Sequence, residues 1–120
     1  MKKKIIAVDL GGTYIRVSLV KNLKVMSYIK EKTPKNKKEL LEKLNFLISD
    51  LMDKDVHGIA VASPGPLKDG VIKNTPNLNL KYFDLKNYLK KRYKVRVEVE
   101  NDAKCVALAE SRLGYKKKNF

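Results

Sequence analysis

The 120-residue sequence predicts an α/β domain with a mixed sheet of about five strands and helices on its faces. Two observations predict this class. The first three apolar segments are strand-like and closely spaced, as in an antiparallel meander. The later strand-like segments alternate with segments whose apolar residues recur at helical spacing. The length suits one compact core rather than two.

Three strands are expected at the start of the chain, over residues 3–10, 14–20 and 25–33. A Gly11-Gly12 turn separates the first two strands. In the second strand, period-two alternation predicts one face formed by Ile15, Val17 and Leu19. Pro34 ends the third strand, because proline cannot donate to a strand ladder.

The rest of the chain predicts helices alternating with strands. The first helix, over residues 36–53, has an apolar stripe formed by Leu40, Leu41, Leu44, Leu47, Ile48 and Leu51. Residues 84–93 predict a second helix, with Asp84 as its N-cap. The other expected elements are an apolar strand at 56–62, a loop at 63–70, an irregular or short-strand segment at 71–83, a strand at 94–100, and a helix at 102–114 that ends at Gly114.

The composition restricts the classes of partner and site. The net charge of +14 would suit a nucleic-acid partner, but the lysines are spread along the chain and there are only four arginines, so no specific nucleic-acid binding is expected. A single Cys105 excludes an internal disulfide, and a single His57 leaves no self-contained zinc site. No apolar run has the length of a membrane span. We therefore expect a cytoplasmic protein without a membrane partner, whose metal, if any, arrives with a substrate.

The stretch AVDLGGTYIRVSLV, residues 7–20, places Asp9 at the end of one strand and Gly11-Gly12-Thr13 directly after it. It matches neither the Walker phosphate loop nor the dinucleotide-binding fingerprint, because both of those lead into a helix. Two interpretations remain open. The glycines and the Thr13 hydroxyl could bind a phosphate, with Asp9 holding a hydrated magnesium ion. Alternatively, the stretch is a tight hairpin that needs glycine for positive φ.

Two later stretches also end strands with residues suited to ligand binding. Ser63-Pro64-Gly65-Pro66 follows an apolar strand, and its Gly65 permits close backbone approach by a ligand. Asn101-Asp102 follows another strand at the start of an expected helix, where helix capping is the alternative role. Ligand sites of α/β domains gather at strand ends, so all three stretches could share one cleft.

In this order the motifs resemble the amino-terminal domain of the ROK sugar kinases (repressor, open reading frame, kinase), which include glucokinases and fructokinases. The resemblance implies the actin-like ATPase, or ribonuclease H-like, fold. It covers essentially the whole chain and rests on Asp9–Thr13, Ser63–Pro66 with Gly70, Thr75-Pro76-Asn77-Leu78, Glu100-Asn101-Asp102-Ala103 and Ala107–Glu110.

The resemblance implies a role for each matching residue. Gly11, Gly12 and Thr13 would border the phosphates of ATP, with Asp9 near Mg²⁺. Gly65, Asn101 and Asp102 would contact the sugar, with Asn77 as a lesser contact. Asp102 would be the base that accepts the proton of the attacking hydroxyl, and a helix amino terminus would keep its carboxylate ionised. Arg16 is expected to be an outward strand charge or to approach the phosphate.

Two departures from the family pattern bear on function. The tryptophan that family kinases carry after the Pro-Asn-Leu stretch is absent, and NLKYFDL takes its place. Residues 1–120 correspond to a single amino-terminal domain, so the carboxy-terminal kinase domain would be absent. We expect half of an ATP-dependent hexose kinase that is inactive alone and pairs with a complementary carboxy-terminal domain or with itself. The alternative is a non-catalytic sugar-binding or adaptor module.

Overall fold

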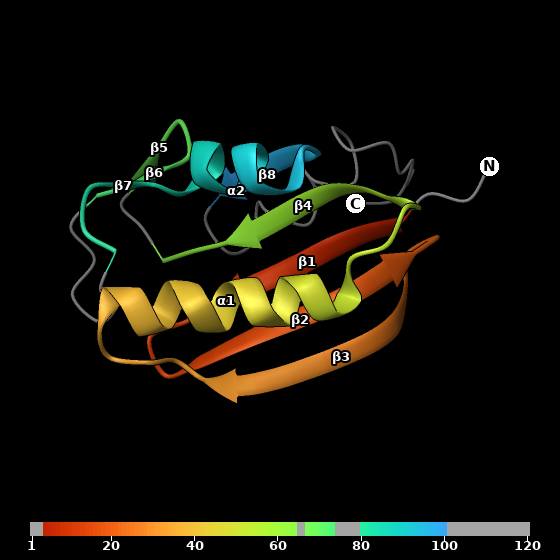
Figure 1. The fold of residues 1–120 in the computed structure, drawn as a ribbon, viewed down its shortest axis with the longest axis horizontal. Coiled ribbons are helices and arrows are strands. Elements are labelled where there is room, and N and C mark those ends of the chain that lie inside the picture. The colour runs from red at the N-terminus through yellow and green to blue at the C-terminus, as the bar shows by residue number, and fades with distance from the viewer. Residues whose placement is uncertain (1–3, 65–66, 74–79, 101–120) are drawn as a thin grey trace.

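The computed structural model describes residues 4–64, 67–73 and 80–100, and its main sheet has five strands in the order β3-β2-β1-β4-β8 (Figure 1). Strands β1 and β2 are antiparallel, as are β2 and β3, whereas β4 is parallel to β1 and β8 is parallel to β4. The predicted mixed sheet is therefore confirmed. The strand bounds are β1 Lys4–Leu10, β2 Tyr14–Lys21, β3 Lys24–Lys32, β4 Val56–Ala62 and β8 Arg96–Glu100.

Two helices, α1 (Lys37–Leu51) and α2 (Leu85–Tyr93), lie side by side on the same face of this sheet (Figure 1). Each begins at a side-chain cap. The Asn36 side chain accepts from the Glu39 N–H at 2.8 Å, and Asp84 accepts from the Asn87 N–H at 3.1 Å, as expected for Asp84. The helix expected at 102–114 lies outside the described residues.

The core fills the space between the helices and the sheet. Ile15, Val17 and Leu19 of β2 are buried, as their alternation predicts. They pair with Leu10, Val8 and Ile6 of β1, so both strands present the same apolar face to α1. The helix contributes the buried Leu40, Leu44, Leu47 and Ile48, whereas Leu41 and Leu51 of the predicted stripe are only partly buried.

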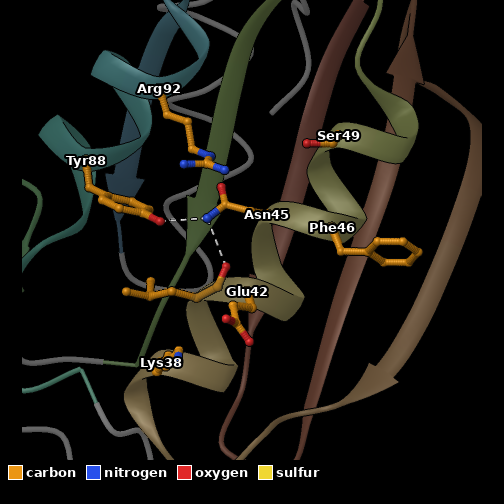
Figure 2. A pocket seen from close by; sticks show the side chains of 8 residues that line it. Lys38, Glu42, Asn45, Phe46, Ser49, Tyr88 and Arg92 are labelled. Carbon is orange, nitrogen blue, oxygen red and sulfur yellow. Dashed lines mark hydrogen bonds between the residues drawn. The ribbon is translucent and has the colours of Figure 1, made fainter.

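A polar network joins the two helices within this largely apolar interface (Figure 2). Asn45 is 8% exposed, and its amide nitrogen donates to the Tyr88 hydroxyl at 2.6 Å and to the Leu41 carbonyl at 2.9 Å. The Tyr93 hydroxyl donates to the Asn45 Oδ1 atom at 2.6 Å. Buried polar groups are stable when their hydrogen bonds are formed, so this network sets how α1 and α2 pack.

A second, three-stranded sheet consists of β5 (Leu67–Lys68), β6 (Val71–Ile72) and β7 (Phe83–Asp84). Part of the expected loop at 63–70 is thus paired as a strand. Asp69 and Gly70 connect β5 to β6 with φ of 53° and 82°, as a two-residue hairpin turn requires. The Gly70 carbonyl accepts from the Lys86 N–H at 3.2 Å, which fixes the small sheet to α2.

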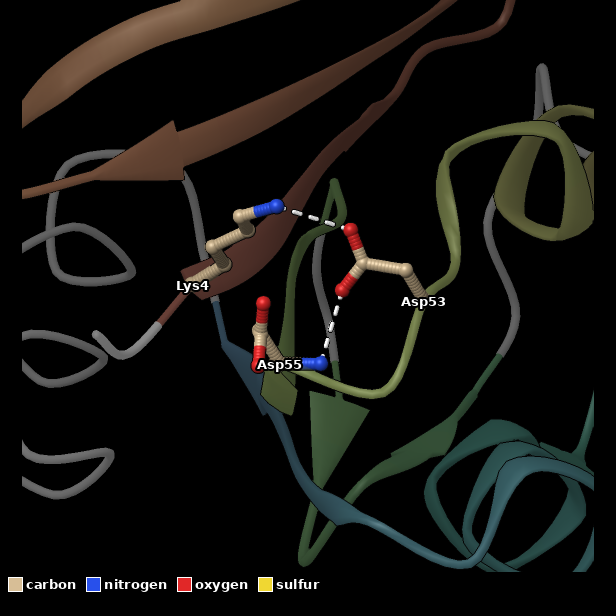
Figure 3. Close-up of polar contacts among 3 residues, drawn as sticks. All are labelled: Lys4, Asp53 and Asp55. Atoms are coloured by element: carbon tan, nitrogen blue, oxygen red, sulfur yellow. Dashed lines mark hydrogen bonds and ion pairs between the residues drawn. The ribbon is translucent and has the colours of Figure 1, made fainter. Parts of the chain in front are cut away.

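An ion pair ties the start of β1 to the connection between α1 and β4 (Figure 3). The Lys4 ammonium donates to Asp53 Oδ2 at 2.8 Å, and Asp53 Oδ1 accepts from the Asp55 N–H at 2.8 Å. The hydrogen bond from Lys4 lowers the pKa of Asp53, and the same bond raises the pKa of Lys4. These residues lie at the end of β1 opposite the Gly11-Gly12 turn.

None of the helices in the described part of the chain is long and apolar enough to cross a membrane.

Candidate functional site

The carboxyl ends of three neighbouring strands meet at one edge of the main sheet. Because β1, β4 and β8 are parallel, Asp9, Ala62 and Glu100 lie in register across them. The N–H of the fully buried Ser63 donates to the Glu100 carbonyl at 2.9 Å, which joins the chain just after β4 to the end of β8. The strand ends predicted to share a cleft are therefore neighbours. Ligand sites of α/β folds usually lie at the carboxyl ends of strands.

The glycine turn after β1 needs glycine because of close backbone contact. The Gly11 N–H donates to the Tyr14 carbonyl at 3.0 Å, and a Cβ on residue 11 would lie only 2.9 Å from that carbonyl oxygen. Among the described glycines, only Gly70 has a positive φ. The turn does join β1 and β2 as an antiparallel hairpin, but the expectation that its glycines supply positive φ is wrong.

Thr33, just after β3, holds the turn from the side. Its hydroxyl donates to the Gly11 carbonyl at 2.7 Å, and its N–H donates to the Thr13 carbonyl at 2.9 Å. The residue is 7% exposed. Sequence reasoning missed Thr33, because its partners are 20 and 22 residues away. The only local signal is a threonine directly before the proline that ends a strand.

Charged side chains surround the turn on the sheet face opposite α1. Asp9 is opposite Arg16 in the β1–β2 register, and the Arg16 Nη1 atom is 3.4 Å from Asp9 Oδ2. The Asp9 side chain is 53% exposed. The Lys30 ammonium lies 4.2 Å from the centre of the Tyr14 ring, and the Arg16 guanidinium lies 5.8 Å from it. One exposed carboxylate and two cations thus lie beside the turn, so Arg16 is an ion-pair partner of Asp9 as well as an outward strand charge.

The structure brings four of the predicted site residues together, namely Asp9, Gly11, Gly12 and Thr13. The other four, Gly65, Asn77, Asn101 and Asp102, lie outside the described residues. Within the described ranges, no three His, Cys, Asp or Glu side chains gather where they could hold a metal ion. Carboxylate and phosphate oxygens are the usual ligands of Mg²⁺, and Asp9 is an exposed carboxylate beside the turn.

A separate groove of about 560 Å³ lies between α1 and α2 (Figure 2). Its lining includes Asn45 and Tyr88 of the polar network, the exposed Phe46, and the cations Lys38 and Arg92. None of the residues predicted to bind ligands lines it.

Comparisons with known proteins identify relatives over almost the whole chain. The ROK family model matches residues 5–119. A glucokinase of Aeropyrum pernix is 31% identical over 116 residues, and the alignment covers 92% of this chain and 36% of that protein. A β-glucoside kinase of Listeria monocytogenes is 31% identical over 121 residues, with 92% of this chain and 39% of that protein covered.

The same relationship holds among solved structures. A ROK family glucokinase of Streptomyces griseus, in complex with glucose and AMPPNP, matches with a TM-score of 0.77 at 26% identity, and the match covers 95% of this chain and 38% of that one. The chain therefore spans less than two fifths of the length of these relatives. Because the family model matches nearly every residue, the chain belongs to the ROK family and has the actin-like ATPase fold of its sugar kinases.

Proposed function

We propose that this chain is the amino-terminal part of an ATP-dependent hexose kinase of the glucokinase type, which transfers the γ-phosphate of ATP to a sugar hydroxyl. The observation that carries the proposal is the position of the Gly11–Thr13 turn beside the joined ends of β4 and β8. The names of the relatives support it, since they are glucokinases and a β-glucoside kinase. A carboxy-terminal kinase domain would supply the other wall of the cleft.

The turn is the proposed binding site for the phosphates of ATP. The backbone N–H groups of Gly12 and Thr13 and the Thr13 hydroxyl are donors suited to phosphate oxygens, whereas the Gly11 N–H is used within the turn. Glycine at position 11 keeps the turn tight, because a Cβ would collide with the Tyr14 carbonyl. Asp9 would share Mg²⁺ with the phosphates, and Mg²⁺ typically uses one or two carboxylates together with phosphate oxygens. Arg16 would turn from Asp9 toward the phosphate charge.

The sugar is proposed to bind where the chain leaves β4 and β8. Gly65, Asn77 and Asn101 would contact its hydroxyl groups, and Asp102 would accept the proton of the attacking hydroxyl. Phosphoryl transfer depends mainly on positioning and charge stabilisation, so one carboxylate aimed at the nucleophile is sufficient base. The described residues that precede these positions, Ser63 and Glu100, are hydrogen bonded to each other, which supports a common sugar site.

Binding by the chain itself is the first test. The ¹⁵N-labelled chain is titrated with Mg·ATP and, separately, with glucose. Mg·ATP should shift the amide signals of Gly11, Gly12 and Thr13, and glucose should shift those near Ser63 and Glu100. Affinities should be weak, on the order of 1 mM, because only one wall of the cleft is present. Saturating amounts of both ligands that leave these signals unmoved would contradict the proposal.

Phosphate transfer is the second test. The chain is joined to the carboxy-terminal domain of the Aeropyrum pernix glucokinase and assayed with a panel of hexoses, including fructose and N-acetylated hexosamines. The two-domain protein should phosphorylate at least one sugar, and the chain alone should not, because closure around both substrates needs both domains. If the chain binds glucose but no pairing transfers phosphate, the non-catalytic sugar-binding module becomes the better description.

A further inference from the structure

We propose that Thr33 is a positioning residue for the donor phosphate: it orients the peptide group between Gly11 and Gly12 so that the Gly12 N–H faces the ligand. This inference rests on the proposed function, in which that turn binds phosphate. It assigns a role in the site to the end of β3, which carries none of the sequence motifs.

The contacts of Thr33 are directed at the turn. Its hydroxyl donates to the carbonyl of Gly11 at 2.7 Å, and its N–H donates to the carbonyl of Thr13 at 2.9 Å. Along the chain, Gly12 and Thr13 lie between these two carbonyls. With 7% of its surface exposed, Thr33 is held among protein atoms, where its hydroxyl needs a hydrogen-bond partner.

The direction of each carbonyl fixes the direction of the N–H group in the same peptide. In a trans peptide the carbonyl and the following N–H point in opposite directions. Because the Gly11 carbonyl is aimed at Thr33, the Gly12 N–H is aimed away from the end of β3. The Tyr14 N–H is likewise opposite to the Thr13 carbonyl, but it points to the β1 side, where the Tyr14 carbonyl accepts from the Gly11 N–H. The Gly12 N–H is thus the donor that the contact with Thr33 turns away from β3.

The Thr33 hydroxyl binds the turn of the β1–β2 hairpin at the Gly11 carbonyl. A closed pair would have the Tyr14 N–H donating to the Gly11 carbonyl as well as the reverse. In the described chain, the bond from the Gly11 N–H to the Tyr14 carbonyl is formed at 3.0 Å, and the Gly11 carbonyl accepts from the Thr33 hydroxyl instead. A bound anion is a partner that the Gly12 N–H fits.

Thr33 is itself held in place before any ligand binds. Strand β3 pairs with β2 along its length, and its last pair is Tyr14 with Lys32. Pro34 restricts the backbone of Thr33 to extended conformations, and β-branching limits the rotation of its side chain. The hydroxyl therefore loses little freedom when it holds the turn, which suits a residue that preorganises a binding site.

The experiment compares three variants in the ¹⁵N-labelled chain. Thr33→Val keeps the shape of the side chain and removes the hydroxyl, whereas Thr33→Ser keeps the hydroxyl. Tyr93→Phe is the matched control, because it removes one hydroxyl and its bond to Asn45 between α1 and α2. Each chain is titrated with Mg·ATP, and the Gly12 amide signal is recorded with and without ligand.

Thr33→Val should move the Gly12 amide signal of the free chain and weaken Mg·ATP binding about tenfold, as the loss of one orienting hydrogen bond predicts. Thr33→Ser should bind within about twofold of the parent, and Tyr93→Phe should bind as the parent does even though it unfolds at a lower temperature. Should Thr33→Val not fold, Thr33→Ala replaces it. Equal binding by the parent and Thr33→Val, or equally weak binding by Thr33→Ser, overturns the role of Thr33. A parent chain that does not bind Mg·ATP overturns the proposed function itself.

Discussion

Replacing Gly11 with alanine tests phosphate binding by the turn separately from the stability of the fold. The added Cβ would lie 2.9 Å from the Tyr14 carbonyl oxygen, and moving it to an ordinary contact of 3.4 Å requires a shift of about 0.5 Å. The nearest atom belongs to the backbone, so no side chain can rotate away. The hydrogen bond from the Gly11 N–H to the same oxygen, 3.0 Å in length, would be stretched to the limit of a useful bond.

The effects on stability oppose each other, and the backbone clash leaves a small net loss. Weakening one backbone hydrogen bond costs about 1 kcal/mol, whereas exchanging glycine for alanine at an allowed φ stabilises by about 0.4–1 kcal/mol through the unfolded chain. Gly11 does not have the positive φ that would forbid alanine. The melting temperature of Gly11→Ala should therefore stay within about 5 °C of the parent. Its affinity for Mg·ATP should fall about tenfold or more, because the N–H donors move with the backbone.

The assay is thermal unfolding by circular dichroism together with Mg·ATP titration of the ¹⁵N-labelled chain. Gly70→Ala is the matched control. Its φ of 82° is unsuitable for alanine and its Cβ would overlap the Lys86 side chain, so this variant should lose stability and keep the affinity of the parent. Parental affinity in Gly11→Ala would refute the assignment of the turn to phosphate. If both variants lost affinity for Mg·ATP in proportion to their loss of stability, the weaker binding would reflect unfolding and not a change in the turn.

Three further outcomes are expected. In the two-domain protein, Asp102→Asn should lower turnover roughly 10²- to 10⁴-fold, because it removes the proposed base. Its melting temperature should stay the same, because asparagine keeps an oxygen that can cap the expected helix, and near-normal turnover would contradict the proposed role of Asp102 as base. Tyr93→Phe should lower the free energy of unfolding in urea by about 1–2 kcal/mol, because it removes the hydroxyl that donates to the buried Asn45. An unchanged urea midpoint would contradict a stabilising role of the network. The stabilisation of the fold by the Lys4–Asp53 pair should be lost as pH falls through the pKa of Asp53, which is held below its usual 3.8. It should also be lost as pH rises through the pKa of Lys4, which is held above its usual 10.5. Asp53→Asn should remove this contribution at both ends of the pH profile of unfolding, and a profile identical to the parent's would show that the pair contributes nothing.

The sequence predicts the main elements well because they depend on local patterns. Alternation in β2 places Ile15, Val17 and Leu19 in the core, and helical spacing identifies α1. Asp84 caps α2 as expected. The small sheet is harder to predict, because β5, β6 and β7 are two residues each and depend on pairing rather than on periodicity. Asn45 is missed for a similar reason, since a polar residue on a helix is buried only where partners from another helix meet it.

For the candidate site, the order and chemistry of the motifs could be predicted from the sequence by itself. Asp9–Thr13 is a contiguous stretch whose residue types suit phosphate and Mg²⁺ wherever the chain places them. The tertiary structure alone decided which distant residues complete the turn. Thr33 reaches Gly11 and Arg16 reaches Asp9 because strands β1, β2 and β3 pair in one particular register. Burial of the apolar face of β1 and β2 against α1 specifies the register of these two strands, whereas β3 is almost wholly exposed and is placed by its backbone pairing with β2. The Asp9–Arg16 contact lies within one hairpin, but Thr33 is 20 and 22 residues from its partners, so no local stretch of sequence could have specified the contacts of Thr33.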